Sequence, residues 1–203
     1  PDSFALLDLA YRSVHRTPRP LHAVTVHHHL RSEAEDELMA VRGWCDARNI
    51  THHRQDLEPP ANPAAARHAR YQALKTVAFE QKLPHILLGH HADDQVESIL
   101  LALVRGAGPK GLGGMRDCRD LGGGIQVLRP FLETPGQILR DHAQEHHLPF
   151  HDEPGNLDPQ SARGRIRTLI RPQLELLRQG CGMAIVNNRA LMQAAGQALQ
   201  TQA

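Results

Sequence analysis

The stretch HILLGHHADDQVESILLALV, residues 85–104, joins two different patterns of apolar residues. Its first part, HILLGH (85–90), is a short apolar run, which predicts a buried strand. From Ala92 to about Arg105 the pattern changes to the i, i+3, i+4, i+7 spacing of one helix face, with apolar side chains at Val96, Ile99, Leu100 and Leu103. The sequence therefore predicts a strand that passes directly into a helix.

The same alternation of strand and helix extends along most of the chain. We expect strands at 21–26, 50–54 and 125–128, and helices at 32–48, from 64 to a stop before Pro84, and at 135–146. Repeated strand–helix alternation is typical of βαβ units. The expected fold class is therefore α/β, with a parallel sheet sandwiched by helices.

The first residues, PDSFALLDLAYR (1–12), already have the pattern of a helix. Asp2 and Ser3 stand before an apolar run, which is the position of helix-capping residues. Since helices in this alternation follow a strand, we expect a strand and a loop before Pro1, and we interpret the chain as truncated at its front.

In parallel α/β sheets, ligands bind at the carboxyl ends of the strands. The residues that follow two of the expected strands are His27-His28-His29 and Gly89-His90-His91. These two loops are therefore the first places to expect a ligand.

Composition excludes several classes of protein. The formal net charge of +1 gives no global attraction to a polyanion, and 3% aromatic residues are too few for a broad base-stacking platform. Cys45, Cys118 and Cys181 form neither a zinc-binding spacing nor a disulfide framework, which favours a reducing cytoplasmic location. No apolar run approaches the ~18 residues of a membrane span, so we expect no membrane partner.

The segment GHHADDQVES (89–98) is the densest group of chemically active side chains. Asp93 and Asp94 fall in the first turn of the predicted helix, where acidic residues can serve only to stabilise the helix dipole. Asp94 and Glu97 are also i, i+3 neighbours, so their carboxylates project together and could hold Mg²⁺ or a substrate ammonium group. The His-His-Asp-Asp run equally suits a metal-dependent hydrolase.

Two other segments carry weaker signals. RGAGPKGLGGM (105–115) is rich in glycine but lacks the Walker A spacing, and we expect a flexible connector there. RGRIR (163–167) places three arginines in five residues, which suits phosphate contacts or a solvated helix face. Arg67 and Arg70 present the same two alternatives on an earlier helix.

Taken together, these segments resemble the catalytic domain of the tRNA(Ile)-lysidine synthetase family, within the PP-loop ATP pyrophosphatases. The family pattern has SGGxDS, VHHxLR, RY, LLGHHADDQxET, RGSGxxGLxGM, RP, DxSNxD and RNRIR. This sequence has, in the same order, PDS, VHHHLR, ARYQAL, LLGHHADDQVES, RGAGPKGLGGM, LRP, DEPGNLD and RGRIR. The resemblance covers residues 1 to about 177.

The resemblance implies an ATP-dependent ligase. ATP would adenylate the C2 oxygen of the wobble cytidine in a CAU-anticodon tRNA(Ile), releasing pyrophosphate. The ε-amino group of L-lysine would then displace AMP and leave lysidine.

The resemblance also implies roles for particular residues. Asp94 and Glu97 would hold or deprotonate the lysine ammonium group, and Arg70 and Arg163 would face phosphates or the adenylate. The nucleotide site would contain His90 among the catalytic residues and Asp2, Ser3, His28 and Gly89 among the ATP-binding ones, with Asp2 assisting through Mg²⁺.

The sequence departs from the family pattern at three places. The SGG of the first motif is absent, SNxD is replaced by GNLD with Asn156, and RNRIR is replaced by RGRIR with Gly164. Glycine is a poor helix former, so we expect a weakened helix at Gly164. The resemblance divides the chain into a nucleotide-binding core at 1–130 and a helical extension at 131–203, and it leaves the oligomeric state open.

Three alternatives remain at this point. A tRNA thiolase of the same superfamily would adenylate a base and deliver sulfur, but such enzymes use paired cysteines that this chain lacks. A metal-dependent hydrolase would use His90, His91, Asp93 and Asp94. A non-catalytic RNA-binding fragment would explain the absent first loop.

Overall fold

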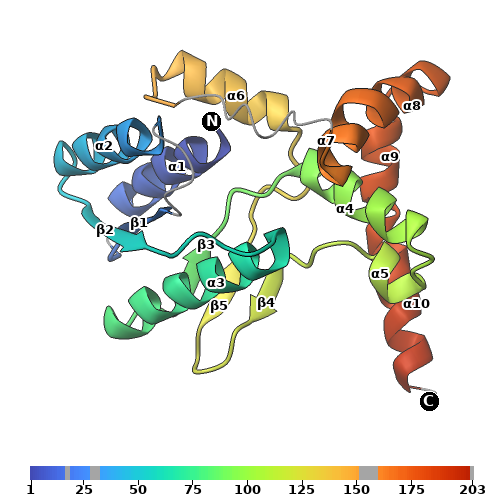
Figure 1. The fold of residues 1–203 in the computed structure, drawn as a ribbon, viewed down its shortest axis with the longest axis horizontal. Helices are drawn as coiled ribbons and strands as arrows, with labels where there is room; N and C mark the ends of the chain where they lie inside the picture. The colour runs from blue at the N-terminus through green and yellow to red at the C-terminus, as the bar shows by residue number, and fades with distance from the viewer. Residues whose placement is uncertain (17–18, 28–32, 151–159, 202–203) are drawn as a thin grey trace. The chain divides into compact units, whose positions relative to one another are not determined.

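The computed structural model of the chain describes residues 1–16, 19–27, 33–150 and 160–201 (Figure 1). The chain divides into two compact units that interleave along the sequence. Unit 1 contains Pro1–Leu88, Cys118–Leu128 and Arg140–His151, and unit 2 contains Gly89–Asp117, Arg129–Leu139 and Asp152–Ala203. The division into functional parts at residue 130 stays a prediction.

Unit 1 holds the strands and the helices that cover them. Its elements are α1 (Asp2–Arg16), β1 (His22–His27), α2 (Glu33–Asp46), β2 (Thr51–Asp56), α3 (Pro63–Glu80), β3 (His85–Leu87), β4 (Cys118–Asp120), β5 (Gln126–Leu128) and the second half of α6 (Gly136–Glu145). Unit 2 is helical in its described residues, with α4 (Ala92–Val104), α5 (Pro109–Leu112), α7 (Ala162–Arg165), a π-helix (Ile166–Ile170), α8 (Arg171–Leu177), α9 (Cys181–Asn187) and α10 (Arg189–Thr201).

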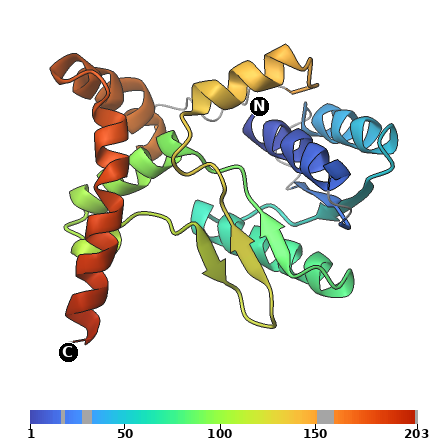
Figure 2. The same ribbon diagram turned by 180° about the vertical axis from the view of Figure 1, so that it is seen from behind.

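The strands pair as the alternation predicts, in two parallel pairs. Strand β1 pairs with β2 from His22↔Thr51 to His27↔Asp56, and β3 pairs with β5 from His85↔Gln126 to Leu87↔Leu128. Strand β4 was not predicted. It adds to β5 in the antiparallel sense, so that β3, β5 and β4 lie side by side (Figure 2).

Glycine makes the turn between β4 and β5 possible. Gly122, Gly123 and Gly124 all have positive φ angles, between 71° and 76°. Side chains disfavour this backbone region, so three successive glycines allow a tight reversal that other residues would resist. The LGGG sequence is therefore the turn of a hairpin.

Two apolar clusters hold unit 1 together. The first joins α1, β1, α2 and the end of α6 around Phe4, Trp44 and the buried Cys45. The second packs Ala78 of α3 on Ile86 and Val127 of the three-stranded sheet. The strands contribute Ala23, Ile86 and Val127 to these clusters, whereas β2 (THHRQD) has no buried residue.

Unit 2 corrects the expectation for the glycine-rich segment 105–115, which is not a flexible connector. Residues Pro109–Leu112 form α5, which packs against α10. A Cβ atom on Gly196 of α10 would lie 3.1 Å from the backbone nitrogen of Lys110. The two helix backbones approach so closely because a glycine stands at the contact.

The expected strand at 85–90 is shorter than predicted. The backbone nitrogen of Leu88 still donates to the carbonyl of Leu128, 3.0 Å away, but β3 ends at Leu87. The following residues turn toward the start of α4. Among the described residues, no helix combines the length and apolar character needed to cross a bilayer.

Candidate active site

The start of α4 is built by a reciprocal pair of hydrogen bonds between His91 and the first turn. The backbone nitrogen of Asp93 donates to Nδ1 of His91 over 3.2 Å, and the backbone nitrogen of His91 donates to Oδ2 of Asp94 over 3.0 Å. This is a capping box with histidine in the place usually taken by serine or threonine. One oxygen of Asp94 therefore has the structural role that was one alternative for this motif.

Asp94 and Glu97 lie on one face of α4, as their spacing predicts, and a protein cation lies between them. Nε of Arg167 donates to Oε1 of Glu97 over 2.7 Å, and Nη2 of Arg167 lies 3.8 Å from Oδ1 of Asp94. The side chain of Glu97 is fully buried, whereas that of Asp94 keeps 16% of its surface exposed. In this structure a guanidinium of the chain itself lies at the carboxylate pair, and binding of Mg²⁺ or a substrate ammonium group there stays a prediction.

Burial dominates the electrostatics of Glu97. It raises the pKa of Glu97 above its ordinary value, and the hydrogen bond from Arg167 opposes this rise only in part. The second oxygen, Oε2, is buried without a hydrogen-bond partner among the described residues. Burial alone would lower the pKa of Arg167, but the hydrogen bond and charge of Glu97 outweigh this effect. The pKa of Arg167 is therefore raised, and the guanidinium stays charged.

Three arginines pair with α4 in reverse chain order. Arg163 donates to Oγ of Ser98 over 3.4 Å, Arg167 contacts Glu97, and Arg171 donates to Oδ1 of Asp93 over 3.0 Å. The segment from Arg163 to Arg171 therefore runs antiparallel to the acidic face of α4. Sequence reasoning singled out Arg163 and missed the roles of the other two, although the i, i+4, i+8 spacing of all three is visible in the sequence.

The π-helix keeps this row of arginines straight. In an α-helix, positions four apart are offset by about 40° around the axis. A π-helix turns less per residue, so four residues fall short of a full turn instead of exceeding it. The angular offset from Arg167 to Arg171 is therefore opposite to that from Arg163 to Arg167, and the three side chains stay on one side of the helix. Pro172 accounts for the widened turn, because it has no N–H to donate to the carbonyl of Thr168 and its ring crowds that carbonyl.

Gly164 is buried in α7, a helix of four residues. The hydroxyl of Ser161 caps this helix by accepting from the backbone nitrogen of Gly164 over 2.9 Å. Gly164 is thus part of a helix that continues into the π-helix and α8, and its weakening effect on that helix stays a prediction.

Gln95, which sequence reasoning did not select, joins α4 to the glycine-rich segment. Its side-chain nitrogen donates to the carbonyl of Met115 over 2.8 Å, and its oxygen accepts from the backbone nitrogen of Met115 over 2.7 Å. Gly114 has a φ of 61°, and a Cβ atom there would lie 2.6 Å from Oε1 of Gln95. The GLGGM and ADDQ sequences are therefore complementary parts of one contact.

The structure brings some of the predicted site residues together in unit 2, and others belong to unit 1. Asp94, Glu97 and Arg163 lie on the contact between α4 and the segment from α7 to α8, and the half-buried Gly89 and His90 directly precede it. In unit 1, Asp2 and Ser3 form the first turn of α1, and the exposed Arg70 lies on α3. The predicted His28 and the departure at Asn156 lie outside the described residues.

A sequence model of the PP-loop domain family matches residues 1–174. The chain belongs to the PP-loop family. Among curated relatives of this PP-loop chain, the tRNA(Ile)-lysidine synthase of Polaromonas naphthalenivorans is 38% identical over 180 residues, which cover 85% of this chain and 53% of the relative. The corresponding protein of Salinispora arenicola is 38% identical over 194 residues, covering 93% of this chain and 57% of the relative.

A third relative, the bifunctional protein TilS/HprT of Listeria innocua, is 34% identical over 183 residues, covering 86% of this chain and 28% of the relative. The chain thus spans about half of the two lysidine synthases, and less of the bifunctional protein.

A solved structure confirms the PP-loop fold. The U34-tRNA thiolase NcsA from Methanococcus maripaludis, solved with its [4Fe-4S] cluster, superimposes with a TM-score of 0.78 at 20% identity, covering 95% of this chain and 69% of that one. The α/β fold class with parallel strand pairing, predicted from the alternation of strands and helices, is confirmed.

Proposed function

We infer that this chain is the catalytic part of a tRNA(Ile)-lysidine synthase. The observation that carries the proposal is its 38% identity to two curated proteins of that name over nearly the whole chain. In the proposed reaction, the C2 oxygen of the wobble cytidine in a CAU-anticodon tRNA(Ile) attacks the α-phosphorus of ATP and pyrophosphate leaves. The ε-amino nitrogen of L-lysine then attacks C2, loses a proton, and displaces AMP.

ATP would bind where α1 begins. The first N–H groups of a helix and its positive dipole end attract phosphate, and Asp2 and Ser3 form this end of α1. Carboxylate oxygens suit Mg²⁺, which usually takes one or two of them and completes its shell with water and phosphate oxygens, so the half-buried Asp2 fits a phosphate-bound ion. Such an ion would neutralise phosphate charge. From the match of their motifs to the family pattern, we also propose His28, Gly89 and His90 as nucleotide contacts.

The two carboxylates of α4 would have different roles toward lysine. Asp94 is the accessible one, so we propose that it holds the ammonium group and accepts its proton. Glu97 is fully buried and one of its oxygens pairs with Arg167, while the other is buried as well, so a ligand reaches this carboxylate only if neighbouring side chains move. In the closed arrangement Glu97 therefore acts by positioning Arg167 beside Asp94.

Arg163 and Arg70 would bind phosphates. Both side chains are exposed, and the 3.4 Å hydrogen bond from Arg163 to Ser98 is longer than is usual for an N–H···O contact. A guanidinium so weakly held can pair with a phosphate of the adenylate or of the tRNA backbone. If Arg163 does so, Asp93, Asp94 and Glu97 face two arginines, which leaves an excess of negative charge for an amine.

The alternative reactions fit the residues less well. Burial raises the pKa of Cys45 to about 11, so it is a poor sulfur carrier, and Cys118 and Cys181 belong to different units. For a hydrolase, Asp93 and Asp94 lie on opposite ring nitrogens of His91, 3.9 Å from Nδ1 and 3.6 Å from Nε2. One ion cannot take both carboxylates and that imidazole in this arrangement.

The test is incorporation of labelled lysine into a CAU-anticodon tRNA(Ile) transcript, with the protein expressed from its complete reading frame. We expect incorporation to depend on ATP and to fall at least 100-fold in Asp94→Asn, which keeps the shape of the side chain but cannot accept a proton. Glu58→Gln, at an exposed loop position, serves as the matched control and should behave as the wild type. Release of AMP without lysine incorporation, when a sulfur donor is supplied, would favour the thiolase instead.

A further inference from the structure

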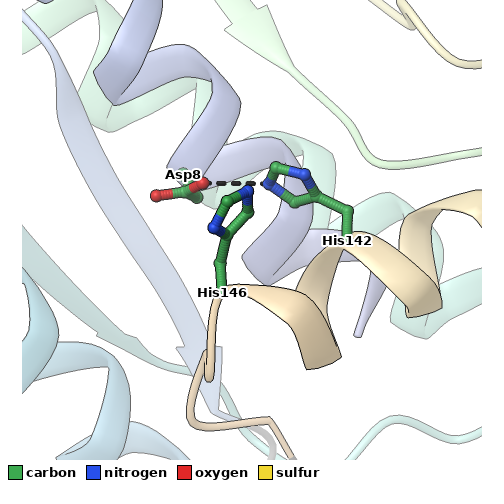
Figure 3. A group of neighbouring side chains, drawn as sticks. All are labelled: Asp8, His142 and His146. Atoms are coloured by element: carbon green, nitrogen blue, oxygen red, sulfur yellow. Dashed lines mark hydrogen bonds and ion pairs between the residues drawn. The ribbon is translucent and has the colours of Figure 1, made fainter.

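Three potential metal ligands meet in unit 1, and the proposed function uses none of the three side chains. Asp8 projects from α1, His142 from α6, and His146 from the residue after the end of α6 (Figure 3). One ligand atom from each residue lies within 4.8 Å of the other two. Asp8 and His142 are 134 positions apart in the chain, so folding creates this group.

The two histidines are placed by helix geometry. The backbone nitrogen of His146 donates to the carbonyl of His142 over 3.1 Å, so the helical turn continues past the end of α6. Side chains four apart on a helix lie on one face, and the two ring centroids here are 4.4 Å apart. Both imidazoles therefore face the same carboxylate (Figure 3).

The dimensions of the group suit a small tetrahedral cation. Zinc lies about 2.0–2.2 Å from nitrogen and oxygen ligands, which places neighbouring ligand atoms about 3.3 Å apart. Nε2 of His142 lies 2.9 Å from Oδ2 of Asp8, and the remaining separations are at most 4.8 Å, so small side-chain rotations are enough. Two imidazoles with one carboxylate are a donor set that selects zinc or another transition metal over Mg²⁺ or Ca²⁺.

Arg12 competes for the same carboxylate. Its Nε donates to Oδ2 of Asp8 over 2.6 Å, the same oxygen that His142 contacts. The side chain of Arg12 is half exposed, whereas Asp8 is buried, so Arg12 can turn into solvent while Asp8 stays in place. Arg12 therefore weakens binding of a cation without blocking it.

We propose that Asp8, His142 and His146 form a binding site for a divalent transition-metal ion of the zinc type. The ion replaces the direct hydrogen bond between Asp8 and His142 and fastens α6 to α1. Three protein ligands leave one coordination position for water.

The first test is titration of the purified protein with zinc chloride in a calorimeter. His146→Ala removes one ligand but leaves the hydrogen bond between Asp8 and His142. We expect this variant to lose the tightest site, with affinity reduced by more than the 10–100-fold typical of changes around metal ligands. His147→Asn is the matched control, because it removes the adjacent exposed histidine, and asparagine tolerates the positive φ of 48° at that position.

The second test uses Arg12→Met and does not depend on removing a ligand. Removing the competing positive charge should tighten zinc binding about tenfold. Equal zinc affinity in the wild type and in His146→Ala would overturn the proposal, as would unchanged or weaker affinity in Arg12→Met. Loss of the tight site in His146→Ala together with its retention in His147→Asn would support the proposal.

Discussion

Replacing Arg167 by methionine should expose the cost of the buried carboxylate beneath it. Glu97 has no exposed side-chain surface, and Arg167 donates to it over 2.7 Å. Breaking a buried ion pair by removing one partner costs about 3–5 kcal/mol, because the remaining charge has no compensation. Since 26% of the Arg167 side chain is exposed, water can partly fill the space that the guanidinium leaves. We therefore expect the free energy of unfolding to fall by about 3 kcal/mol.

The loss should depend on pH in a definite direction. Burial already raises the pKa of Glu97 above 4.5, and without Arg167 nothing in the pair opposes that rise. The folded state then binds the proton more tightly than the unfolded state, so stability decreases as the pH rises from 4.5 through the raised pKa. Arg167→Met should therefore be least destabilised near pH 4.5 and most destabilised at pH values above the raised pKa of Glu97.

Urea unfolding of the variants over this pH range measures both effects. A loss of about 3 kcal/mol shifts the midpoint by about 1–3 M. The double variant Glu97→Gln/Arg167→Met should recover part of the loss, since it contains no buried charge. Arg178→Met, which removes an exposed guanidinium after α8, should stay within about 0.5 kcal/mol of the wild type. A loss in Arg167→Met that is the same at all pH values, or no recovery in the double variant, would contradict this explanation.

Two further predictions concern backbone positions. Gly114→Ala should destabilise the protein by more than about 1 kcal/mol, because φ at this position is 61° and the added Cβ would lie 2.6 Å from Oε1 of Gln95. Gly123→Ala is the control: its φ is also positive, but no atom lies within 4 Å of the added Cβ, so the loss of stability in the same urea titration should be smaller. Gly43→Ala should stabilise the protein by about 0.5–1 kcal/mol, because Gly43 lies exposed inside α2 and no atom lies within 4 Å of the added Cβ. A lower urea midpoint for this variant would contradict the prediction.

The elements with one strong periodic pattern were predictable from the sequence. Helix α4 occupies Ala92–Val104 because its apolar face repeats at helical spacing. The short strands expected at 21–26 and 50–54 were located to within two residues, the first because β-branched residues gather there. Strand β4 was not predictable in this way. Its residues Cys118–Asp120 are all exposed, so no burial pattern marks them, and only pairing with β5 defines the strand.

The candidate site was predictable for residues within one helix, where spacing fixes which side chains share a face. Asp94 and Glu97 were found together for that reason. The pairing of Arg167 with Glu97 joins residues 70 positions apart and depends on how two helices pack, which no local pattern records. The role of Gln95 was not predicted, because an uncharged amide side chain gives no sequence signal of a functional contact. In the structure Gln95 makes two hydrogen bonds to the backbone of Met115.

The widened turn at Ile166–Ile170 also constrains how the chain can vary in length. A π-helical turn contains one residue more than an α-helical turn needs, so deleting a residue there leaves a regular helix intact. The α-helical turn that remains winds through nearly the same angle with one residue fewer, so the following side chains keep nearly the same orientation and Arg171 still faces Asp93. A deletion elsewhere in the helix would instead rotate every following side chain by about 100°. Differences in length between Arg163 and Arg171 should therefore be confined to the widened turn in proteins that use this row of arginines.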